Sequence, residues 1–457
     1  MVNPQIFREY DIRGVVDRDL TPEVVFDLGR ALGAYLGGER GARVALGHDN
    51  RTSSELFRDR LAEGLMASGC HVIGVGLVPT PILYFAIYEF GAEGGVMITG
   101  SHNPPEYNGF KVCKGKDPIY GPQIQEVRRL IEKGAYPKPR GPGALEERDA
   151  RGPYVEFLLG KLKFERPLRV VVDAGNGVGG LVGPYRMGKM GAEVRELFCE
   201  PDASYPHHHP DPLVPENLSF LIEEVKRWGA EVGVAYDGDA DRIGVVDERG
   251  KIVWADELLI LYAREVLAER PGSTIVFDVK CSVNLVSEIE RLGGKPLMWK
   301  TGHSLIRQKL RQEGAPLGGE LSGHMFFADD YFGYDDAIYA SLRLLRLLAS
   351  GEVPLSERLK GLPPTVATPE FRIECPDEEK FGVVEAIQAH FRELYPTVEV
   401  DGARVDFGEG WSLVRASNTQ PALVLRFEAD SEAALSRIQK EVWKKLREFP
   451  AVRVPDA

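Results

Sequence analysis

Three aspartates at alternate positions give the strongest chemical signal in the sequence. Asp237, Asp239 and Asp241 lie in the run DGDADR, residues 237–242. Carboxylates this close together repel one another unless a cation lies between them. Oxygen ligands without cysteine or histidine favour Mg²⁺. A calcium-binding EF-hand loop ending at Glu248 and an unmetallated loop are the alternatives, but Arg242 stands where an EF-hand requires glycine.

Ser101, in the run TGSHNP at residues 99–104, is the candidate phosphoryl carrier. A serine hydroxyl is a poor nucleophile until a base, a cation or a metal stabilises the alkoxide that forms. A phosphoserine beside Mg²⁺ is instead a phosphoryl donor. Alone, this serine would be typical of an ordinary turn. The accompanying metal loop, adjacent His102 and nearby Lys111 favour the donor role.

Basic side chains are needed as well, because a phosphoserine and a sugar phosphate each carry about −2 charge. At ~7 Å and an effective dielectric of ~20 they repel by roughly 9 kcal/mol. Each candidate could equally be a surface charge, although Arg242 and Arg415 are embedded in loops with other polar residues. The candidates are Arg8, Arg13, Lys111, Arg242, Lys280 and Arg415.

Two more loops carry clustered polar residues. The run RASNTQP at residues 415–421 offers cationic, hydroxyl and backbone donors suited to a phosphate, with an ordinary polar turn as the alternative. In GELSGH, residues 319–324, Glu320 and Ser322 suit a sugar diol, and His324 could carry a proton. His303 is a secondary candidate. The prolines around residues 207–209, HHH, indicate an exposed structural loop and not a metal site.

The elements that must position these loops repeat three times along the chain. In each repeat, apolar strand-like runs alternate with helical stretches, which predicts mixed, largely parallel sheets buried on both faces. Such sheets bind ligands in the loops beyond their strand ends. The third run of each repeat leads into a polar motif: residues 95–98 into TGSHNP, 232–236 into DGDADR, and 315–317 into GELSGH.

We therefore predict an α/β protein with three similar mixed α/β domains and a smaller C-terminal α+β domain around a central cleft. Gly- and Pro-containing stretches suggest the boundaries. The expected domains are 1–142 with the serine loop, 143–250 with the metal loop, 251–362 with the sugar-reading loop, and 363–457 with the phosphate loop. In the last, helices are expected near 381–395 and 431–449 beside a strand at 422–427.

Composition excludes several classes of partner. The net charge of −13 over 457 residues argues against nucleic acid or an anionic membrane. The 5 cysteines are scattered without a CxxC pair, as expected for reduced thiols in the cytoplasm. The first residues lack the apolar core expected of a signal peptide, and no apolar stretch approaches the roughly 18 residues of a membrane span. We expect a cytoplasmic monomer or small homo-oligomer.

In combination and order, these motifs resemble the α-D-phosphohexomutase superfamily, and within it the bacterial phosphomannomutase/phosphoglucomutase group. The resemblance covers essentially the whole chain. It rests on Tyr10 and Arg13 in the opening motif and on the four runs TGSHNP, DGDADR, GELSGH and RASNTQP. Gly100 and Leu321 stand where alanine and methionine are frequent in the superfamily.

The resemblance implies roles for individual residues. Ser101 would be the phosphoserine, and its phosphate would share Mg²⁺ with the three aspartates. Glu320 and Ser322 would read the sugar's 3- and 4-hydroxyls. Lys111, His324 and Arg13 are candidates for proton transfer or charge stabilisation, with the general base left open. The non-reacting phosphate would be bound by Arg415, Ser417, Asn418 and Thr419.

The implied reaction interconverts hexose 1-phosphate and hexose 6-phosphate of mannose, glucose or both. A hexose 1,6-bisphosphate would be the intermediate and activator, and would turn over in the cleft. Phosphoglucosamine mutase is the alternative, although the sugar loop lacks the Glu-Gln-Ser pattern and the phosphate loop lacks the Gly-Thr-Glu ending of that group. A metal-dependent sugar phosphatase and a non-enzymatic sugar-phosphate sensor are further alternatives.

Overall fold

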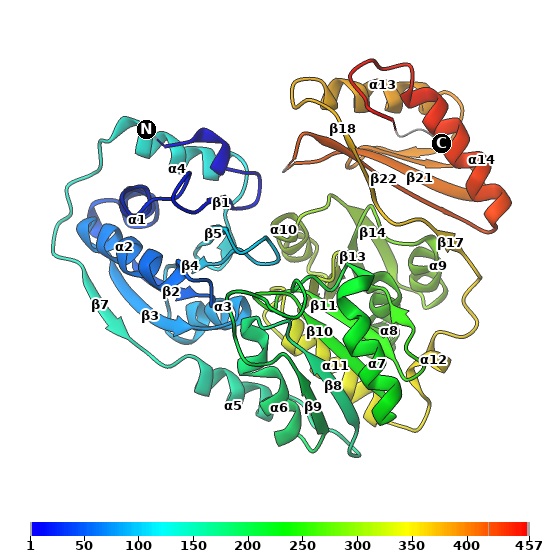
Figure 1. The fold of residues 1–457 in the computed structure, drawn as a ribbon, viewed down its shortest axis with the longest axis horizontal. Coiled ribbons are helices and arrows are strands. Elements are labelled where there is room, and N and C mark those ends of the chain that lie inside the picture. Colours follow the sequence, from blue (N-terminus) through cyan, green and yellow to red (C-terminus); the bar gives the residue numbers. More distant parts are fainter. Residues whose placement is uncertain (1, 419, 455–457) are drawn as a thin grey trace.

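Four β-sheets follow one another along residues 2–418 and 420–454, the part of the chain that the computed structural model describes. Each sheet with its helices forms one domain. In Figure 1 the first domain lies at the left, the last at the upper right, and the second and third lie below and between them. This arrangement agrees with the predicted three α/β domains and smaller last domain.

The first two domains have mixed sheets. The first is seven-stranded, in the order β1-β5-β4-β2-β3-β7 with β6 beside β5, and the second is five-stranded, in the order β12-β11-β10-β8-β9. The elements of the first domain are η1 (Pro4–Ile6), β1 (Ile12–Val15), α1 (Pro22–Gly37), η2 (Gly38–Arg40), β2 (Arg43–His48), α2 (Ser54–Ala67), β3 (His71–Leu77), α3 (Thr80–Glu89), β4 (Gly94–Ile98), β5 (Tyr107–Lys114), β6 (Asp117–Pro118), α4 (Pro122–Lys133) and β7 (Ala144–Glu147). Those of the second are α5 (Arg151–Lys161), β8 (Arg169–Asp173), η3 (Val178–Leu181), α6 (Gly183–Lys189), β9 (Glu193–Leu197), η4 (Pro215–Leu218), α7 (Ser219–Trp228), β10 (Val232–Tyr236), β11 (Ile243–Asp247) and β12 (Ile252–Val253).

The third sheet is four-stranded, in the order β14-β13-β15-β16, and the fourth is six-stranded and antiparallel throughout. The third domain contains α8 (Ala255–Glu269), β13 (Thr274–Asp278), α9 (Val283–Arg291), β14 (Lys295–Trp299), α10 (His303–Glu313), β15 (Leu317–Gly319), β16 (Met325–Phe327), α11 (Ala337–Ala349) and α12 (Leu355–Arg358). The last contains β17 (Val366–Ala367), β18 (Phe371–Glu374), α13 (Lys380–Arg392), β19 (Thr397–Val398), β20 (Ala403–Asp406), β21 (Gly410–Ala416), β22 (Ala422–Ala429) and α14 (Glu432–Leu446).

The strands that lead into the predicted motifs are buried on both faces. β4 and β10 have no residue outside the buried class, as continuous apolar runs in a covered parallel sheet require. β15 differs from the prediction: the strand begins at Leu317, the last residue of the run expected at 315–317, and extends through Gly319. Its glycines do not favour a strand by themselves, but pairing with β13 and β16 on either side holds them there.

Two edge strands, β7 and β12, lie just beyond the predicted domain boundaries at residues 142 and 250. β7 pairs in parallel with β3, so the first sheet extends past the boundary predicted at residue 142. β12 pairs with β11, so the second sheet extends past residue 250. Both are short edge strands whose polar or brief sequences gave no strand pattern, and only their pairing assigns them.

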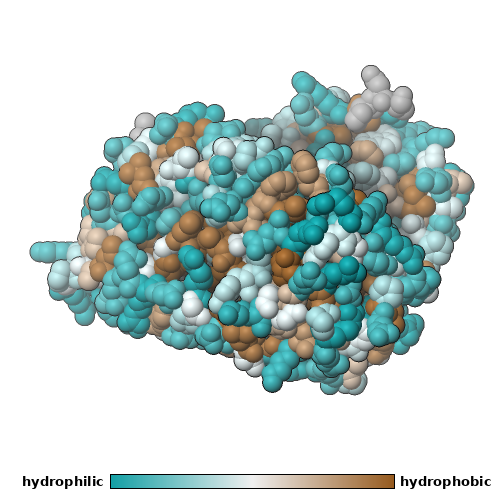
Figure 2. Space-filling model, turned by 60° about the horizontal axis from the view of Figure 1, so that its bottom comes forward, coloured by the Kyte–Doolittle hydropathy of each residue, from teal (hydrophilic) through white to brown (hydrophobic). Residues whose placement is uncertain are grey.

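One large hydrophobic cluster joins the first three domains, and a small cluster of Val279, Trp411 and Leu413 joins the third domain to the last. One cluster of buried residues runs from β2 of the first domain through the second and third domains. The last domain has its own cluster between its sheet and helices α13 and α14. Among the described residues no helix is long and apolar enough to span a membrane. On the face in Figure 2, hydrophobic residues lie in groups separated by hydrophilic ones.

One buried cation in the second domain has no role that the fold explains. The Arg186 side chain in α6 is 0% exposed, and none of its three guanidinium nitrogens has a hydrogen-bond partner among the described residues. Burial lowers its pKa to about 10. An unpaired buried charge opposes folding. We therefore predict that Arg186→Leu raises the free energy of unfolding by about 1–3 kcal/mol, measured from urea unfolding curves.

The exposed Lys189 on the same helix provides the control for this prediction. Lys189→Leu should change the free energy of unfolding by less than about 0.5 kcal/mol, because a surface substitution removes no unpaired buried charge. A lower urea midpoint for Arg186→Leu than for the unsubstituted protein would mean that the guanidinium has a stabilising partner.

Candidate active site

One cavity of about 600 Å³ lies between the four domains and collects most of the predicted site residues. The three aspartates lie beneath its wall and are 0% exposed. Thr419, predicted to bind phosphate, lies outside the described residues. The predicted residues that line the cavity are Tyr10, Arg13, Ser101, Lys111, Arg242, Lys280, His303, Glu320, Ser322, His324, Arg415, Ser417 and Asn418.

Ser101 follows β4 in a left-handed backbone conformation, with φ of 49°. This conformation is unfavourable for a residue with a side chain and persists only where its surroundings hold it. It brings the Ser101 Oγ to 2.8 Å from the Asp237 Oδ2 and 3.0 Å from the His102 Nδ1. Burial, followed by the charges of Arg242 and Arg13, lowers the pKa of His102 well below its ordinary value. A neutral imidazole therefore stands beside the serine oxygen at neutral pH.

Arg51 holds the serine loop and was not predicted from the sequence. Its buried guanidinium donates hydrogen bonds to the backbone carbonyls of Ser101 at 2.9 Å, Asn103 at 2.5 Å, Pro104 at 2.6 Å and Tyr107 at 2.8 Å. The guanidinium leaves no room for a side chain at Gly100, where a Cβ would lie 2.3 Å from the Arg51 Cζ. The only sequence signal was the position of Arg51 in the polar loop after β2.

The three aspartates of the metal loop converge as predicted. Their ligand atoms all lie within 4.8 Å of one another. The Oδ1 atoms of Asp239 and Asp241 are buried and have no hydrogen-bond partner among the described residues. Burial and the two neighbouring carboxylates raise the pKa of Asp237 well above its ordinary value. A cation would be a partner for the two Oδ1 atoms and would offset the repulsion between the carboxylates. These residues therefore fit a hard divalent metal ion.

Lys111 partly supplies that positive charge. Its ammonium pairs with the Asp239 Oδ2 at 2.6 Å and also with the Asp241 Oδ2. Burial alone would lower the pKa of Lys111, but the aspartates raise it above its ordinary value. Conversely, Lys111, His324 and Arg242 outweigh burial and hold the pKa of Asp241 low. Lys111 is thus positively charged, which suits charge stabilisation and excludes its action as a base in this arrangement.

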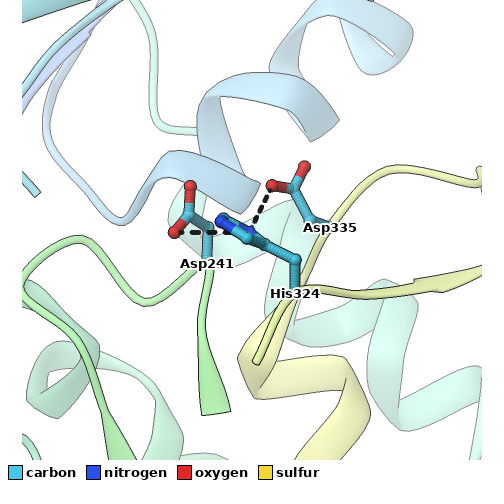
Figure 3. Close-up of side chains that lie close together, drawn as sticks. All are labelled: Asp241, His324 and Asp335. Carbon is cyan, nitrogen blue, oxygen red and sulfur yellow. Dashed lines mark ion pairs between the residues drawn. The ribbon is translucent and has the colours of Figure 1, made fainter. Parts of the chain in front are cut away.

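A second acidic group lies beside the metal loop (Figure 3). Asp241, His324 and Asp335 place three donor atoms within 4.8 Å of one another. The His324 Nδ1 lies 2.9 Å from the Asp335 Oδ2 and 3.7 Å from the Asp241 Oδ1. The Arg242 Nε donates to the His324 Nε2 at 3.0 Å, so Nε2 is the acceptor and Nδ1 is the nitrogen that carries a proton. A protonated Nδ1 cannot ligate a metal, so this arrangement orients His324 and Arg242 instead.

The His303 ring stacks on His324, with centroids 5.3 Å apart, and its Nδ1 lies 3.5 Å from the Asp335 Oδ2. Burial lowers the pKa of His303 to about 4. The neutral ring therefore favours folding fully above the ordinary pKa of about 6.5, and that advantage is lost as the pH falls toward 4. Between pH 7.5 and 5 we predict a loss of up to about 2 kcal/mol in the free energy of unfolding from this group.

His303→Gln should remove that part of the pH dependence, because the amide does not titrate. The measurement is urea unfolding of both proteins at pH 7.5 and 5.0. Replacement of the exposed His71 by glutamine is the matched control and should leave the pH dependence nearly unchanged. Equal pH dependence in the His303→Gln variant and the unsubstituted protein would contradict the prediction.

The predicted sugar-reading pair forms a small hydrogen-bonded unit. The Glu320 Oε2 accepts from the Ser322 hydroxyl at 2.7 Å, and its Oε1 accepts from the Gly302 backbone N–H, also at 2.7 Å. Burial raises the pKa of Glu320. The carboxylate is thereby fixed in orientation at the cavity wall, where it can accept hydrogen bonds from a diol.

The phosphate loop between β21 and β22 meets the N-terminal motif. The Tyr10 hydroxyl donates to the Thr301 carbonyl at 2.7 Å and accepts from the Asn418 Nδ2 at 2.6 Å. Tyr10 therefore joins the first, third and last domains at the cavity. The Arg415 Nε bonds to the Asp401 Oδ2 at 2.9 Å, which orients its guanidinium.

The remaining predicted cations also lie at the cavity, and Lys280 and Arg13 have an acidic partner there. The Lys280 Nζ lies 2.8 Å from the Glu370 Oε1, and Arg13 pairs with Asp11 at 2.5 Å. Arg8, which could equally have been a surface charge, lines the cavity as well. These pairs keep the cations neutralised and in place.

The three consecutive histidines have separate partners, as expected for a structural segment. His207 bonds to the Asn176 Oδ1 at 2.9 Å, and His208 bonds to Asp173 at 3.1 Å. His209 contacts the His102 carbonyl of the serine loop. His208 and His209 are only partly exposed, so the segment is packed against the site more closely than its prolines suggested.

Comparison with known proteins places each of the four domains in one family. Models of phosphoglucomutase/phosphomannomutase alpha/beta/alpha domains I, II and III match residues 4–138, 152–250 and 254–366. The model of the phosphoglucomutase/phosphomannomutase C-terminal domain matches residues 370–445.

Full-length relatives agree with the domain matches. A phosphomannomutase/phosphoglucomutase of Pseudomonas putida is 46% identical over 454 residues, which are 98% of this chain and 97% of that protein. A phosphoglucomutase of Neisseria gonorrhoeae is 45% identical over 441 residues, 96% of each chain. The crystal structure of a phosphoglucomutase/phosphomannomutase family protein from Burkholderia thailandensis is 43% identical, covers 100% of both chains and superposes with a TM-score of 0.94. The chain is a member of the phosphoglucomutase/phosphomannomutase family.

Proposed function

We propose that the protein interconverts hexose 1-phosphates and hexose 6-phosphates, of mannose, glucose or both. The observation that carries this proposal is the position of the Ser101 Oγ, 2.8 Å from a carboxylate of the three-aspartate cluster. The same cavity holds the phosphate loop and the diol-reading pair. A phosphoryl donor, a cation site and a separate phosphate anchor are the parts that a mutase needs.

Each transfer moves one phosphoryl group between Ser101 and a sugar hydroxyl. The bond from phosphorus to the Ser101 Oγ breaks and a bond from phosphorus to the sugar oxygen forms. The sugar hydroxyl gives up its proton, and the Ser101 Oγ takes one up. The first transfer yields a hexose 1,6-bisphosphate, and the second returns the other phosphate to Ser101. Neutral His102 lies beside the serine oxygen, while charged Lys111 offsets the phosphate charge.

The aspartate cluster would hold Mg²⁺ through Asp237, Asp239 and Asp241, together with an oxygen of the phosphate on Ser101. Oxygen-only ligands favour Mg²⁺ over zinc, and the two unpartnered carboxylate oxygens support a cation here. When bound, the ion neutralises charge that develops on the transferred group.

The substrate's other phosphate would lie against Arg415, Ser417 and Asn418, with Thr419 as a further ligand. Glu320 and Ser322 would accept or donate hydrogen bonds at the 3- and 4-hydroxyls. Mannose and glucose differ at C2, so a pair that reads these two hydroxyls should accept both sugars. Because Lys280 is paired with Glu370, an arriving phosphate would exchange one anionic partner of this lysine for another.

One assay tests this proposal against its rivals. The protein is incubated with glucose 1-phosphate, mannose 1-phosphate or glucosamine 1-phosphate, Mg²⁺ and a trace of the matching 1,6-bisphosphate. Formation of the 6-phosphate from glucose or mannose supports the mutase. Faster conversion of the glucosamine compound would indicate a phosphoglucosamine mutase, release of inorganic phosphate a phosphatase, and binding without turnover a sensor.

A further inference from the structure

Thr80 connects the first domain to the metal loop of the second. It is the first residue of α3, and its side chain is 0% exposed. Its hydroxyl donates to the Asp239 Oδ2, and its backbone N–H donates to the Asp239 carbonyl oxygen at 3.0 Å. Thr80 does not line the cavity, so it would not touch substrate. Both of these bonds cross a domain boundary and converge on one residue of the metal loop.

The two carboxylate oxygens of Asp239 have different surroundings. Oδ2 accepts the Thr80 hydroxyl and the Lys111 ammonium, the latter at 2.6 Å. Oδ1 is buried and has no hydrogen-bond partner among the described residues. Occupation of Oδ2 thus fixes the rotation of the carboxylate and leaves Oδ1 as the oxygen available to a cation.

The two donors to Oδ2 differ in how they respond to a cation. A divalent ion at the aspartate cluster repels the nearby Lys111 ammonium, because like charges this close repel strongly in a buried site. A neutral hydroxyl has no such repulsion and can stay on Oδ2. The amino-terminal end of α3, which carries a partial positive charge, also attracts the carboxylate of Asp239.

We propose that Thr80 is a positioning residue for the metal site. Its hydroxyl sets the orientation of Asp239, and its backbone bond ties the metal loop to the domain that carries Ser101. This role rests on the proposed function, in which the aspartates hold a divalent ion beside Ser101. Donors that orient a metal ligand in this way commonly contribute 10- to 100-fold to metal affinity, by order of magnitude.

The test measures the affinity of the substrate-free protein for Mn²⁺, with the free ion followed by electron paramagnetic resonance. Thr80→Val keeps the shape of the side chain and removes the hydroxyl, and should raise the Kd by about 10- to 100-fold. Thr80→Ser keeps the hydroxyl, and its Kd should stay within about threefold of that of the unsubstituted protein. Thr368→Val removes a hydroxyl that bonds to the Phe427 backbone in the last domain, and should leave the Kd unchanged.

Thr80→Ala also removes the hydroxyl but is smaller than valine. If Thr80→Val does not fold, Thr80→Ala should show the same rise in Kd. An unchanged Kd in a folded Thr80→Val or Thr80→Ala protein overturns the proposal, and so does an equally weakened Thr80→Ser. If the protein is a mutase, Thr80→Val should need more Mg²⁺ for half-maximal rate but recover most of its kcat at saturation. Absence of mutase activity in the unsubstituted protein would refute the proposed function, whereas the Mn²⁺ affinities test Thr80 independently.

Discussion

Ser101→Ala is expected to lower the rate of hexose phosphate isomerisation by about 10⁴-fold or more, because the variant lacks the oxygen that carries the phosphoryl between the two transfers. The Ser101 Oγ is the only oxygen of this residue's side chain, and it lies 2.8 Å from the aspartate cluster. The dissociation constant for glucose 6-phosphate should change far less, since the phosphate loop and Glu320 are untouched. A coupled assay gives the rate, and intact mass should show phosphate on the unsubstituted protein but not on the variant.

Backbone strain has to be separated from loss of the oxygen. Residue 101 has a φ of 49°, where alanine is strained but glycine is not. Ser101→Gly should therefore fold at least as well as Ser101→Ala and be equally inactive. Ser350→Ala, at an exposed serine after α11, is the matched control and should retain full activity. Substantial turnover by Ser101→Gly would show that the phosphoryl carrier is another residue.

Much of the fold was predictable because buried parallel strands leave a simple pattern. Val232–Tyr236 was expected as a strand and is one, with every residue buried against neighbours on both faces. β7 left no such pattern, since its residues Ala144–Glu147 are largely exposed and its assignment depends on pairing with β3. Gly318 and Gly319 likewise join a strand only through their partners. Edges of sheets are set by tertiary contacts, which a single sequence does not contain.

The site residues also fall into those that could be predicted from the sequence and those that could not. Residues inside the loop motifs could be recognised, because their chemistry is concentrated in a few consecutive positions. Arg51, Thr80 and Asp335 could not, because each acts on a partner far away in the sequence: Arg51 on Ser101, and Thr80 on Asp239 across 159 positions. Asp335 meets His324 and His303 only once the third domain is folded. The sequence predicts the groups that react, whereas the groups that hold them emerge from the fold.

Removal of the divalent ion should stop the reaction without unfolding the protein. We predict that a chelator lowers the rate by about 10³-fold or more, because a metal ion supplies several kcal/mol of stabilisation to transferring phosphate. The fold should survive, since Lys111 pairs with two of the three carboxylates. Added Mg²⁺ should restore the rate. Circular dichroism of the chelated protein and a coupled assay are the measurements.

Lys111 allows a further test, because its positive charge both offsets the negative charge of the aspartates and opposes binding of the ion to them. Lys111→Met should lower the free energy of unfolding of the metal-free protein by about 3–5 kcal/mol, as expected when one partner of a buried ion pair is removed. The same variant should bind Mg²⁺ more tightly, so the ion should stabilise it more than it stabilises the unsubstituted protein. Its activity should nevertheless stay low, because the charge that offsets the transferring phosphate is lost.

Lys114 is on the same strand, β5, but exposed, and Lys114→Met is the matched control. It should leave the free energy of unfolding and the effect of Mg²⁺ within about 0.5 kcal/mol of the unsubstituted values. Urea unfolding of all three proteins, with chelator and with saturating Mg²⁺, measures the free energy of unfolding of each variant and how much the ion changes it. Equal stabilisation of Lys111→Met and the unsubstituted protein by Mg²⁺ would mean that the lysine and the ion do not share the aspartates.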